Sequence, residues 1–330
     1  MKVSSSEGEV RTSSKAPPSE PSVREVMGRF ALFCLPIVLV LLVTEIGMRR
    51  VDNSYRTKLR SVEAQKGELQ VLVTGSSTGL FGVDPSLFSA KGYNVATVSQ
   101  TAYYDDAFVR PRIAEMPKLK LILVVLSTPS LEMRLGEGPE YWRQFWYEHF
   151  WGIAPEIAPS VFDARHYSLA ALYPRAVELP AAQRGFRFDA QPGINSAGFL
   201  PVETDGHQVD DAHGIARAAY HKSIMRPENI AINVGFFSNL LAAAKARSVT
   251  TTFLLAPVSR HYRAHRDPEA LGRIESTLAE LRGKGARTAN YLDDPRFEDE
   301  HFGDPDHLNP KGAAVFSRIL DEEIVKPVLQ

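Results

Sequence analysis

Short apolar runs and apolar stripes at helical spacing alternate along the chain after residue 68. Runs rich in β-branched and apolar residues, without strict alternation, are typical of strands buried on both faces of a parallel sheet. They lie at residues 70–74, 93–98, 119–126, 249–255 and 290–293. Helical periodicity marks residues 105–116, 229–246, 271–283 and 310–324. This order predicts a three-layer α/β/α sandwich with a mainly parallel sheet of about five strands.

The N-terminal region has a different pattern. Residues 1–28 are rich in Ser, Pro, Lys and Glu, which predicts a disordered tail. The stretch from Phe30 to Met48 is almost free of charge and long enough to cross a bilayer as a helix, so a transmembrane helix is expected over 29–48. A cleaved signal peptide and a buried core helix are the less favoured alternatives, since no small-x-small cleavage site precedes Arg49. Residues 49–68 are charged and are expected to form a stalk.

Length and composition favour one large domain over residues 69–330. The pattern of strands and helices lapses between residues 138 and 215, which predicts an inserted cap region there. A net charge of -1 and a pI near 6.8 give no reason to expect nucleic acid as a partner. The single cysteine, Cys34, excludes an intrachain disulfide and a cysteine-rich metal site.

The first strand after residue 69 ends at small residues and a serine. Gly75, Ser76 and Ser77 follow it directly, at the sheet edge where open α/β folds form their binding crevices. Ser77 is therefore a candidate nucleophile. The alternative is an ordinary strand-to-loop turn, because Gly and Ser occur in most loops.

A second candidate segment precedes the last helix. Asp304 lies three residues before His307, a spacing that lets a carboxylate hold one imidazole nitrogen while the other takes a proton from a hydroxyl. Asn309 is expected to cap the helix that begins at Pro310. The alternative is that Asp304 and Asp306 only form a turn and that His307 is a surface residue.

These two segments resemble the SGNH/GDSL hydrolase superfamily. The resemblance rests on Gly75-Ser76-Ser77 near the start of the domain and on Asp304-x-x-His307 near its end. More closely, the chain resembles a membrane-anchored branch with Gly-Ser-Ser in place of Gly-Asp-Ser. That branch is similar to the D-alanyl-transfer protein of lipoteichoic acid synthesis and to polysaccharide O-acetylation proteins. The resemblance implies that Ser77, His307 and Asp304 form a catalytic triad.

The resemblance also implies an oxyanion hole, in which this sequence departs from the family pattern. Ser99 stands where the family has a glycine that donates a backbone N–H, and a backbone donor survives that change; the alternative is that residues 99–101 only cap a helix. The family asparagine after the third strand is missing. Ser127 and Thr128 are the candidate hydroxyl donors in its place.

Orientation across the membrane is decided by the resemblance rather than by charge. Basic residues are more frequent after the apolar stretch than before it, which by itself places the domain in the cytoplasm. Large domains translocate largely regardless of such charges, and the resemblance implies an extracytoplasmic domain.

The inserted region holds all three tryptophans. Aromatic residues recur at helical spacing between Tyr141 and Trp151, a stripe that suits packed core more often than a sugar-binding or membrane-interface surface. His261 and His265 have no obvious third ligand, and no Walker or Rossmann glycine pattern occurs. No metal and no cofactor are therefore expected.

The sequence thus predicts a membrane-anchored serine esterase or O-acyltransferase. Its expected partners are the lipid bilayer, through Phe30 to Met48, an acylated glycan or glycolipid of the cell envelope as substrate, and a membrane acyl-transfer protein. The alternative function is a non-catalytic, membrane-tethered binding or assembly subunit of an envelope polysaccharide modification system that keeps the hydrolase fold.

Overall fold

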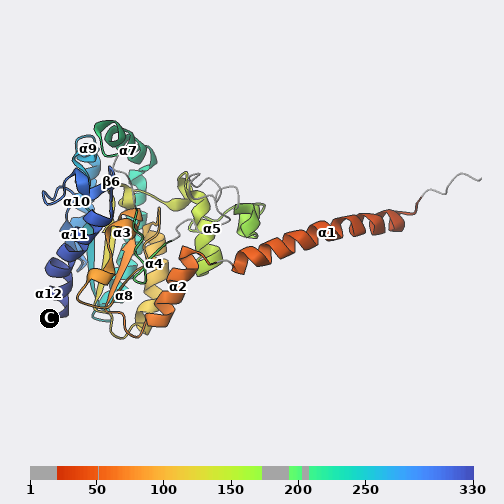
Figure 1. The fold of residues 1–330 in the computed structure, drawn as a ribbon, viewed down its shortest axis with the longest axis horizontal. Coiled ribbons are helices and arrows are strands. Elements are labelled where there is room, and N and C mark those ends of the chain that lie inside the picture. Colours follow the sequence, from red (N-terminus) through yellow and green to blue (C-terminus); the bar gives the residue numbers. More distant parts are fainter. Residues whose placement is uncertain (1–20, 51, 173–192, 203–207) are drawn as a thin grey trace, which may run out of the picture. The chain divides into compact units, whose positions relative to one another are not determined.

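The computed structural model describes residues 21–50, 52–172, 193–202 and 208–330. The chain forms two compact units, residues 1–49 and residues 50–330 (Figure 1). Most of the predicted tail, residues 1–20, lies outside the described residues, as does part of the predicted cap region.

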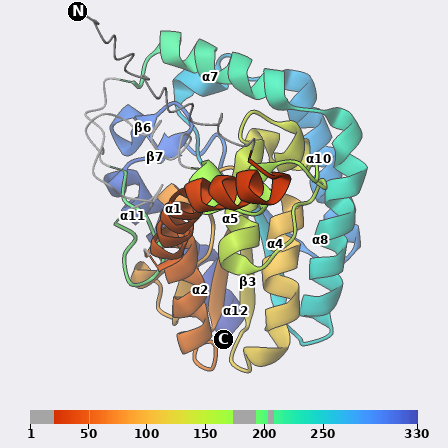
Figure 2. The same ribbon diagram turned by 90° about the vertical axis from the view of Figure 1, so that its right-hand side faces the viewer.

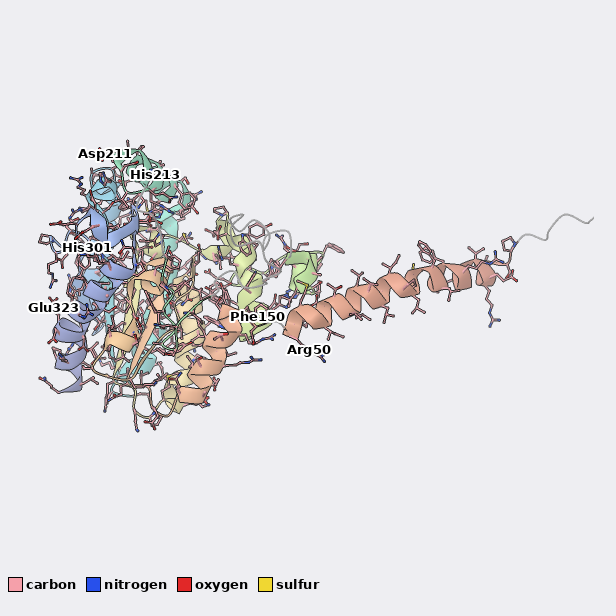
Figure 3. The ribbon with its side chains drawn as sticks, in the orientation of Figure 1. Arg50, Phe150, Asp211, His213, His301 and Glu323 are labelled. Carbon is pink, nitrogen blue, oxygen red and sulfur yellow. The ribbon has the colours of Figure 1, made fainter. Side chains whose placement is uncertain are left out.

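Helix α1 (Val23–Arg50) contains the predicted membrane span and begins before the expected residue 29. Its apolar side chains are exposed along its length, and Figure 3 shows them standing out from the ribbon. Pro36 lies inside the helix, a position that membrane helices tolerate. By length and composition, α1 can cross a membrane.

A parallel five-stranded sheet forms the centre of the second unit. Its strands are β1 (Val71–Gly75), β2 (Gly92–Asn94), β3 (Leu121–Leu126), β4 (Thr250–Leu255) and β5 (Arg287–Asn290). They lie in the order β2-β1-β3-β4-β5. The chain moves to opposite sides of β1 to form β2 and β3, so the carboxyl ends of β1 and β3 are the switch point where such sheets bind ligands.

Helices cover both faces of the sheet (Figures 1 and 2). On one face lie α3 (Ser77–Gly82), α11 (Pro310–Leu320) and α12 (Lys326–Leu329); on the other lie α2 (Ser54–Gln65), α4 (Ala102–Val109), α8 (Ile230–Lys245) and α10 (Pro268–Gly283). Val71, Val73 and Leu123 pack with Phe316 and Leu320 on the first face. The predicted three-layer sandwich is thus confirmed.

The segment expected to be a stalk is part of the domain. Helix α2 occupies most of residues 49–68, and its Tyr55, Lys58 and Val62 side chains are fully buried. Lys58 Nζ donates to the carbonyls of Asn94 and Gly198 at 2.8 and 2.7 Å. Such buried contacts exclude a free spacer over α2.

The aromatic residues between Tyr141 and Trp151 belong mainly to the packed core, which is the interpretation that their helical spacing favoured. They run through α5 (Gln144–Trp146) and a π-helical turn over Tyr147–Trp151. Trp146, Tyr147 and Trp151 are buried and lie around Tyr55 of α2, with ring centroids 5.1 to 5.6 Å apart. These rings attach the inserted region to α2.

Several boundaries differ from the predictions. Strand β2 ends at Asn94 rather than residue 98, although Val95 and Thr97 still donate to the carbonyls of Val73 and Gly75; the chain then turns at Ser99, whose φ is 56°. Helix α4 tightens into a 3₁₀ turn over Arg110–Glu115, where Pro111 removes a helical donor. Strand β5 ends where the last strand was expected to begin.

Four further elements lie at the carboxyl end of the sheet. Helix α7 (Asp211–Ile224), which was not predicted, packs on α9 (Arg260–Arg263). Both lie at the same end of the molecule as the antiparallel pair β6 (Phe302–Asp304) and β7 (His307–Leu308) (Figures 1 and 2).

Candidate active site

Ser77 is placed by a turn that only glycine permits. Gly75 ends β1 with a φ of 124°, and a Cβ on it would lie 2.1 Å from the Val125 carbonyl oxygen. The chain therefore turns sharply against β3 and enters α3 at Ser77. This brings the Ser77 side chain to the switch point of the sheet.

His307 and Asp304 are placed by a tight hairpin. Asp304 Oδ1 accepts the backbone N–H groups of Asp306 and His307 at 3.1 and 3.0 Å. Asp304 Oδ2 lies 2.8 Å from His307 Nδ1, and His307 Nε2 lies 2.8 Å from Ser77 Oγ. The structure thus brings the three predicted triad residues into one hydrogen-bonded line.

The helix that follows fixes this hairpin. Asn309 Oδ1 caps α11 by accepting the Gly312 N–H at 3.0 Å, and Pro310 is the first helical residue. A Cβ on Gly312 would lie 2.1 Å from the His301 carbonyl oxygen, so α11 approaches the hairpin closely. The apolar stripe of α11 then anchors the corner in the core.

Charge around His307 favours its protonated form. Burial lowers the pKa of His307, but the carboxylates of Asp306 and Asp304 outweigh burial and raise it to about 8. Burial has the opposite effect on Asp304 and raises its pKa. The nearby charges of His307 and then Arg217 outweigh burial and hold the pKa of Asp304 well below its usual range. Asp304 is therefore ionised at neutral pH, and His307 becomes a free base only toward pH 8.

Helix α7 supplies two side chains that sequence reasoning missed. Arg217 Nε lies 2.9 Å from Asp306 Oδ1, and another guanidinium nitrogen lies 3.6 Å from Asp304 Oδ2. His221, one turn further along, lies 3.4 Å from Asp306 Oδ2 and 2.7 Å from the Tyr262 hydroxyl. Burial lowers the pKa of His221 to about 4, so this histidine is neutral. The i, i+4 spacing of Arg217 and His221 was the available signal.

The oxyanion candidates have different surroundings. Ser99 adopts a φ of 56°, the left-handed conformation that a glycine takes more readily. Within the described chain, the N–H groups of Ser77 and Ser99 donate to no backbone carbonyl. Ser127 lines a cavity that also contains Ser77, Ser99 and His307, and its Oγ lies 2.8 Å from Ser130 Oγ. Thr128 is 2 % exposed and does not line that cavity.

A buried polar network holds the loop that carries Ser99. Gln100 Nε2 donates to Asp105 Oδ1 at 2.6 Å and to Thr74 Oγ1 at 2.9 Å. Asp105 is buried, which raises its pKa to about 6 despite these hydrogen bonds. The network links the end of β1 to the start of α4 and so fixes the position of Ser99.

A cavity of about 330 Å³ opens at Ser77 Oγ and His307. Its apolar wall consists of Phe81, Val98, Pro129, Met133 and Ile224, and its polar wall of Glu140, Arg143, Arg217, Tyr220 and His221. Phe81 contacts the His307 ring edge-on, with centroids 5.2 Å apart. The cavity therefore offers a ligand both apolar and hydrogen-bonding surfaces.

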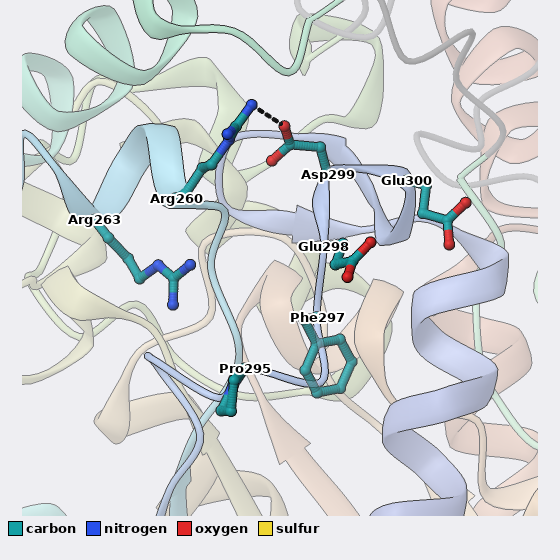
Figure 4. A pocket seen from close by; sticks show the side chains of 7 residues that line it. All are labelled: Arg260, Arg263, Pro295, Phe297, Glu298, Asp299 and Glu300. Atoms are coloured by element: carbon teal, nitrogen blue, oxygen red, sulfur yellow. Dashed lines mark ion pairs between the residues drawn. The ribbon is translucent and has the colours of Figure 1, made fainter.

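A second hollow, of about 610 Å³, lies at other residues (Figure 4). Its lining is Arg260, Arg263, Pro295, Phe297, Glu298, Asp299 and Glu300. Arg260 and Asp299 form an ion pair there at 2.8 Å. This lining has no hydroxyl nucleophile beside a base, so the smaller cavity is the candidate for nucleophilic chemistry.

One group of possible metal ligands coincides with the triad. Ligand atoms of Asp304, Asp306 and His307 lie within 4.8 Å of one another. His307 Nδ1 is already held by Asp304, and Arg217 lies against Asp306. A cation beside this guanidinium would be repelled, so the group does not fit a metal site.

No family model matches the chain, and no curated protein matches it in sequence. It is similar in structure to a proposed acylhydrolase of Bacteroides fragilis NCTC 9343, with 11% identity and a TM-score of 0.38, over 82% of this chain and 98% of that one. It is also similar to a GDSL-like lipase of Bacteroides thetaiotaomicron VPI-5482, with 10% identity and a TM-score of 0.39, over 83% and 100% of the two chains. Neither similarity assigns the chain to a family.

Proposed function

We propose that this protein is a serine-dependent esterase or O-acyltransferase that acts on acyl esters of oxygen. The observation that carries the proposal is the line from Ser77 Oγ through His307 to Asp304, with two separations of 2.8 Å, at the mouth of a cavity. A serine hydroxyl is a poor nucleophile until a base accepts its proton, and this arrangement supplies both the base and the carboxylate that orients it.

In the proposed reaction, Ser77 Oγ attacks the ester carbonyl carbon while His307 Nε2 takes the hydroxyl proton. The tetrahedral intermediate collapses as His307 returns that proton to the departing alcohol, which leaves an acyl group on Ser77. Water, or the hydroxyl of an acceptor, then attacks the acyl carbon with His307 again as base; the bond between Ser77 Oγ and the acyl carbon breaks, His307 returns the proton to Ser77 Oγ, and the acid or the new ester leaves. Asp304 remains ionised and holds His307 Nδ1 throughout.

The backbone N–H groups of Ser77 and Ser99 are the proposed oxyanion donors. Both residues line the cavity. Ser127 is a proposed third donor, but its hydroxyl is already engaged with Ser130, so its contribution is smaller. Losing one oxyanion donor typically costs about 2.7–4 kcal/mol of barrier, and this predicts modest turnover of simple esters.

The proposal also includes a place at the cell envelope. An anchor through α1 would hold the domain at a membrane surface, and the sequence resemblance suggests an acylated envelope glycan or glycolipid as substrate, with a membrane acyl-transfer protein as partner. A single cysteine placed in an exposed loop, in a Cys34→Ala background, tests the outward orientation. Labelling by an impermeant thiol reagent on intact cells is expected; protection of that cysteine would contradict it.

The second candidate function is a binding or assembly subunit without catalysis. Thr128 does not line the cavity, and no amide side chain stands among the lining residues on the β3 side. A site with only backbone donors would suit a protein that binds an acylated glycan without cleaving it. Reactivity of Ser77 distinguishes the two candidates.

Labelling with a serine-directed fluorophosphonate probe tests the catalytic proposal. We expect labelling of the full chain, its loss in Ser77→Ala and in His307→Gln, and its retention in Ser76→Ala. Ser76 is the matched control because it is adjacent, yet among the described residues its Oγ bonds to hydroxyl groups, such as Thr78 Oγ1 at 3.1 Å, and to no imidazole. A wild-type chain that neither labels nor turns over aryl acetates would favour the subunit function.

A further inference from the structure

We propose that Asp306 and Arg217 are positioning residues for His307, an opposed pair of charges that sets the pH range in which the imidazole accepts the Ser77 proton. The inference rests on the proposed function for its catalytic consequence. The two charges act on the protonation of His307, which can be measured without turnover.

Asp306 is a second carboxylate beside the same imidazole nitrogen. Its Oδ1 lies 3.6 Å from His307 Nδ1, whereas Asp304 Oδ2 lies 2.8 Å away. Only 4 % of Asp306 is exposed, so solvent screens its charge weakly. Asp304 orients the ring by a direct hydrogen bond, and Asp306 adds negative charge without competing for that bond.

Arg217 opposes this negative charge from α7. It lies 2.9 Å from Asp306 and 3.6 Å from Asp304, so one guanidinium faces both carboxylates. The contact to Asp306 is an ion pair rather than an aligned hydrogen bond, because Oδ1 has no hydrogen-bond donor of suitable geometry in the described chain. Arg217 also lines the cavity, so bound substrate would further shield these charges from water.

The remaining groups near His307 do not change the direction in which Asp306 and Arg217 shift its titration. They come from three elements: Ser77 and Phe81 on α3, His221 on α7, and Tyr262 on α9 behind His221. Ser77, Phe81, neutral His221 and Tyr262 carry no charge at working pH. Glu140 and Arg143, on the polar wall of the cavity, pair with each other.

Two charge-removing variants are therefore expected to move His307 in opposite directions. Asp306→Asn removes the negative charge and should lower the titration midpoint of His307 by about one pH unit. Arg217→Gln should raise that midpoint, and the double variant should lie between the two. The midpoint is measured by NMR of histidine-labelled full-length protein in detergent micelles, with the signal assigned by its loss in His307→Gln.

Lys222→Gln is the matched control. It removes a cation from the same helix, but Lys222 is largely exposed and pairs with Asp267 instead. The titration midpoint of His307 in Lys222→Gln should equal that in the wild type. If Arg217→Gln fails to fold because Asp306 is left buried without a partner, Asp306→Asn and the double variant still decide the matter. Equal shifts in one direction, or none in Asp306→Asn, would overturn the proposal.

Kinetic measurements on the same variants distinguish this inference from the proposed function. In an active enzyme, the acid limb of kcat/KM for an aryl acetate should move with the NMR midpoint in each variant. A protein without turnover whose His307 midpoint still moves in opposite directions would contradict the catalytic function and support the charge pair. Turnover by variants whose His307 midpoint does not move would support the catalytic function and contradict the charge pair.

Discussion

The two walls of the candidate site are held in place by different forces. The serine wall, formed by β1, α3 and the end of β3, is fixed by backbone geometry and apolar packing. Gly75 turns with a φ of 124°, and a Cβ on Gly79 would lie 3.0 Å from the Val125 side chain. Asp105, whose pKa is about 6, is hydrogen-bonded to Thr74 of β1; above that pH the position of Ser77 depends on space rather than on charge.

The base wall depends on charge. The hairpin of β6 and β7 places two carboxylates and an imidazole together, and Arg217 of α7 lies against both carboxylates. Removing one member leaves the others buried without their partner, which is costly. The comparison teaches that variants of the serine wall should act through sterics at every pH, and that variants of the base wall should act through protonation.

The largest expected effect is that of Asp304→Asn. An amide in place of the carboxylate cannot hold His307 in the tautomer that leaves Nε2 free, so kcat should fall by about 10⁴-fold. Steady-state kinetics with an aryl acetate measures the loss, and Asp293→Asn, at an exposed ion pair with Arg266, is the control. Unchanged kcat would exclude Asp304 as the orienting carboxylate.

On the serine wall, Gly75→Ala is expected to destabilise the fold. A Cβ there meets the Val125 carbonyl oxygen at 2.1 Å, and the φ of 124° is unfavourable for alanine. The free energy of unfolding should fall by about 3 kcal/mol or more, equally at pH 6 and pH 9. Urea denaturation measures it. Gly235→Ala in α8, where a Cβ meets nothing within 4 Å, should instead stabilise.

The base wall predicts opposite pH trends for activity and stability. With the pKa of His307 at about 8, kcat/KM at pH 7 should be about a tenth of its value on the alkaline plateau. The same raised pKa stabilises the fold fully below the unfolded value, near pH 6.5, and this contribution of about 2 kcal/mol is lost as the pH rises through 8.

Urea denaturation of the wild type and of His307→Gln at pH 6 and pH 9 measures that contribution. The difference in unfolding free energy between the two proteins should be larger at pH 6. A difference that grows toward pH 9 would show that the charges of Asp304 and Asp306 do not act on His307 as the geometry requires.

The sequence predicted those parts of the site that local signals define. β1 has an uninterrupted apolar run, and the last helix begins with Asn309-Pro310, an N-cap followed by a preferred first residue. Both signals fix a corner without reference to the rest of the chain. The five-stranded parallel sheet followed from the alternation of such runs, although β5 was misplaced because its residues are polar and partly exposed.

The parts that sequence reasoning missed depend on contacts between distant segments. Arg217 and His221 meet Asp306 only because α7 packs against α9 at the carboxyl end of the sheet. Their i, i+4 spacing places both side chains on one face of a helix, but it does not indicate which residues that face contacts. Likewise, Ser127 and Thr128 were equivalent candidates in the sequence, and only the turn after β3 separates the one that lines the cavity from the one that is buried.

The smallest expected effect concerns the strain at Ser99, which lies in the turn after β2, lines the cavity and carries a proposed oxyanion donor. A non-glycine residue in the left-handed conformation costs about 1 kcal/mol, so Ser99→Gly should raise the free energy of unfolding by about that amount or less, since glycine also gains freedom in the unfolded chain. Ser248→Gly is the matched control, because Ser248 has a φ of 57° and lies in the turn between α8 and β4. Ser99→Val, which disfavours this conformation more strongly, should lower kcat for an aryl acetate, whereas Ser248→Val should only destabilise. Equal effects of the two valine variants on kcat would show that Ser99 has no role in turnover beyond the strain it shares with Ser248.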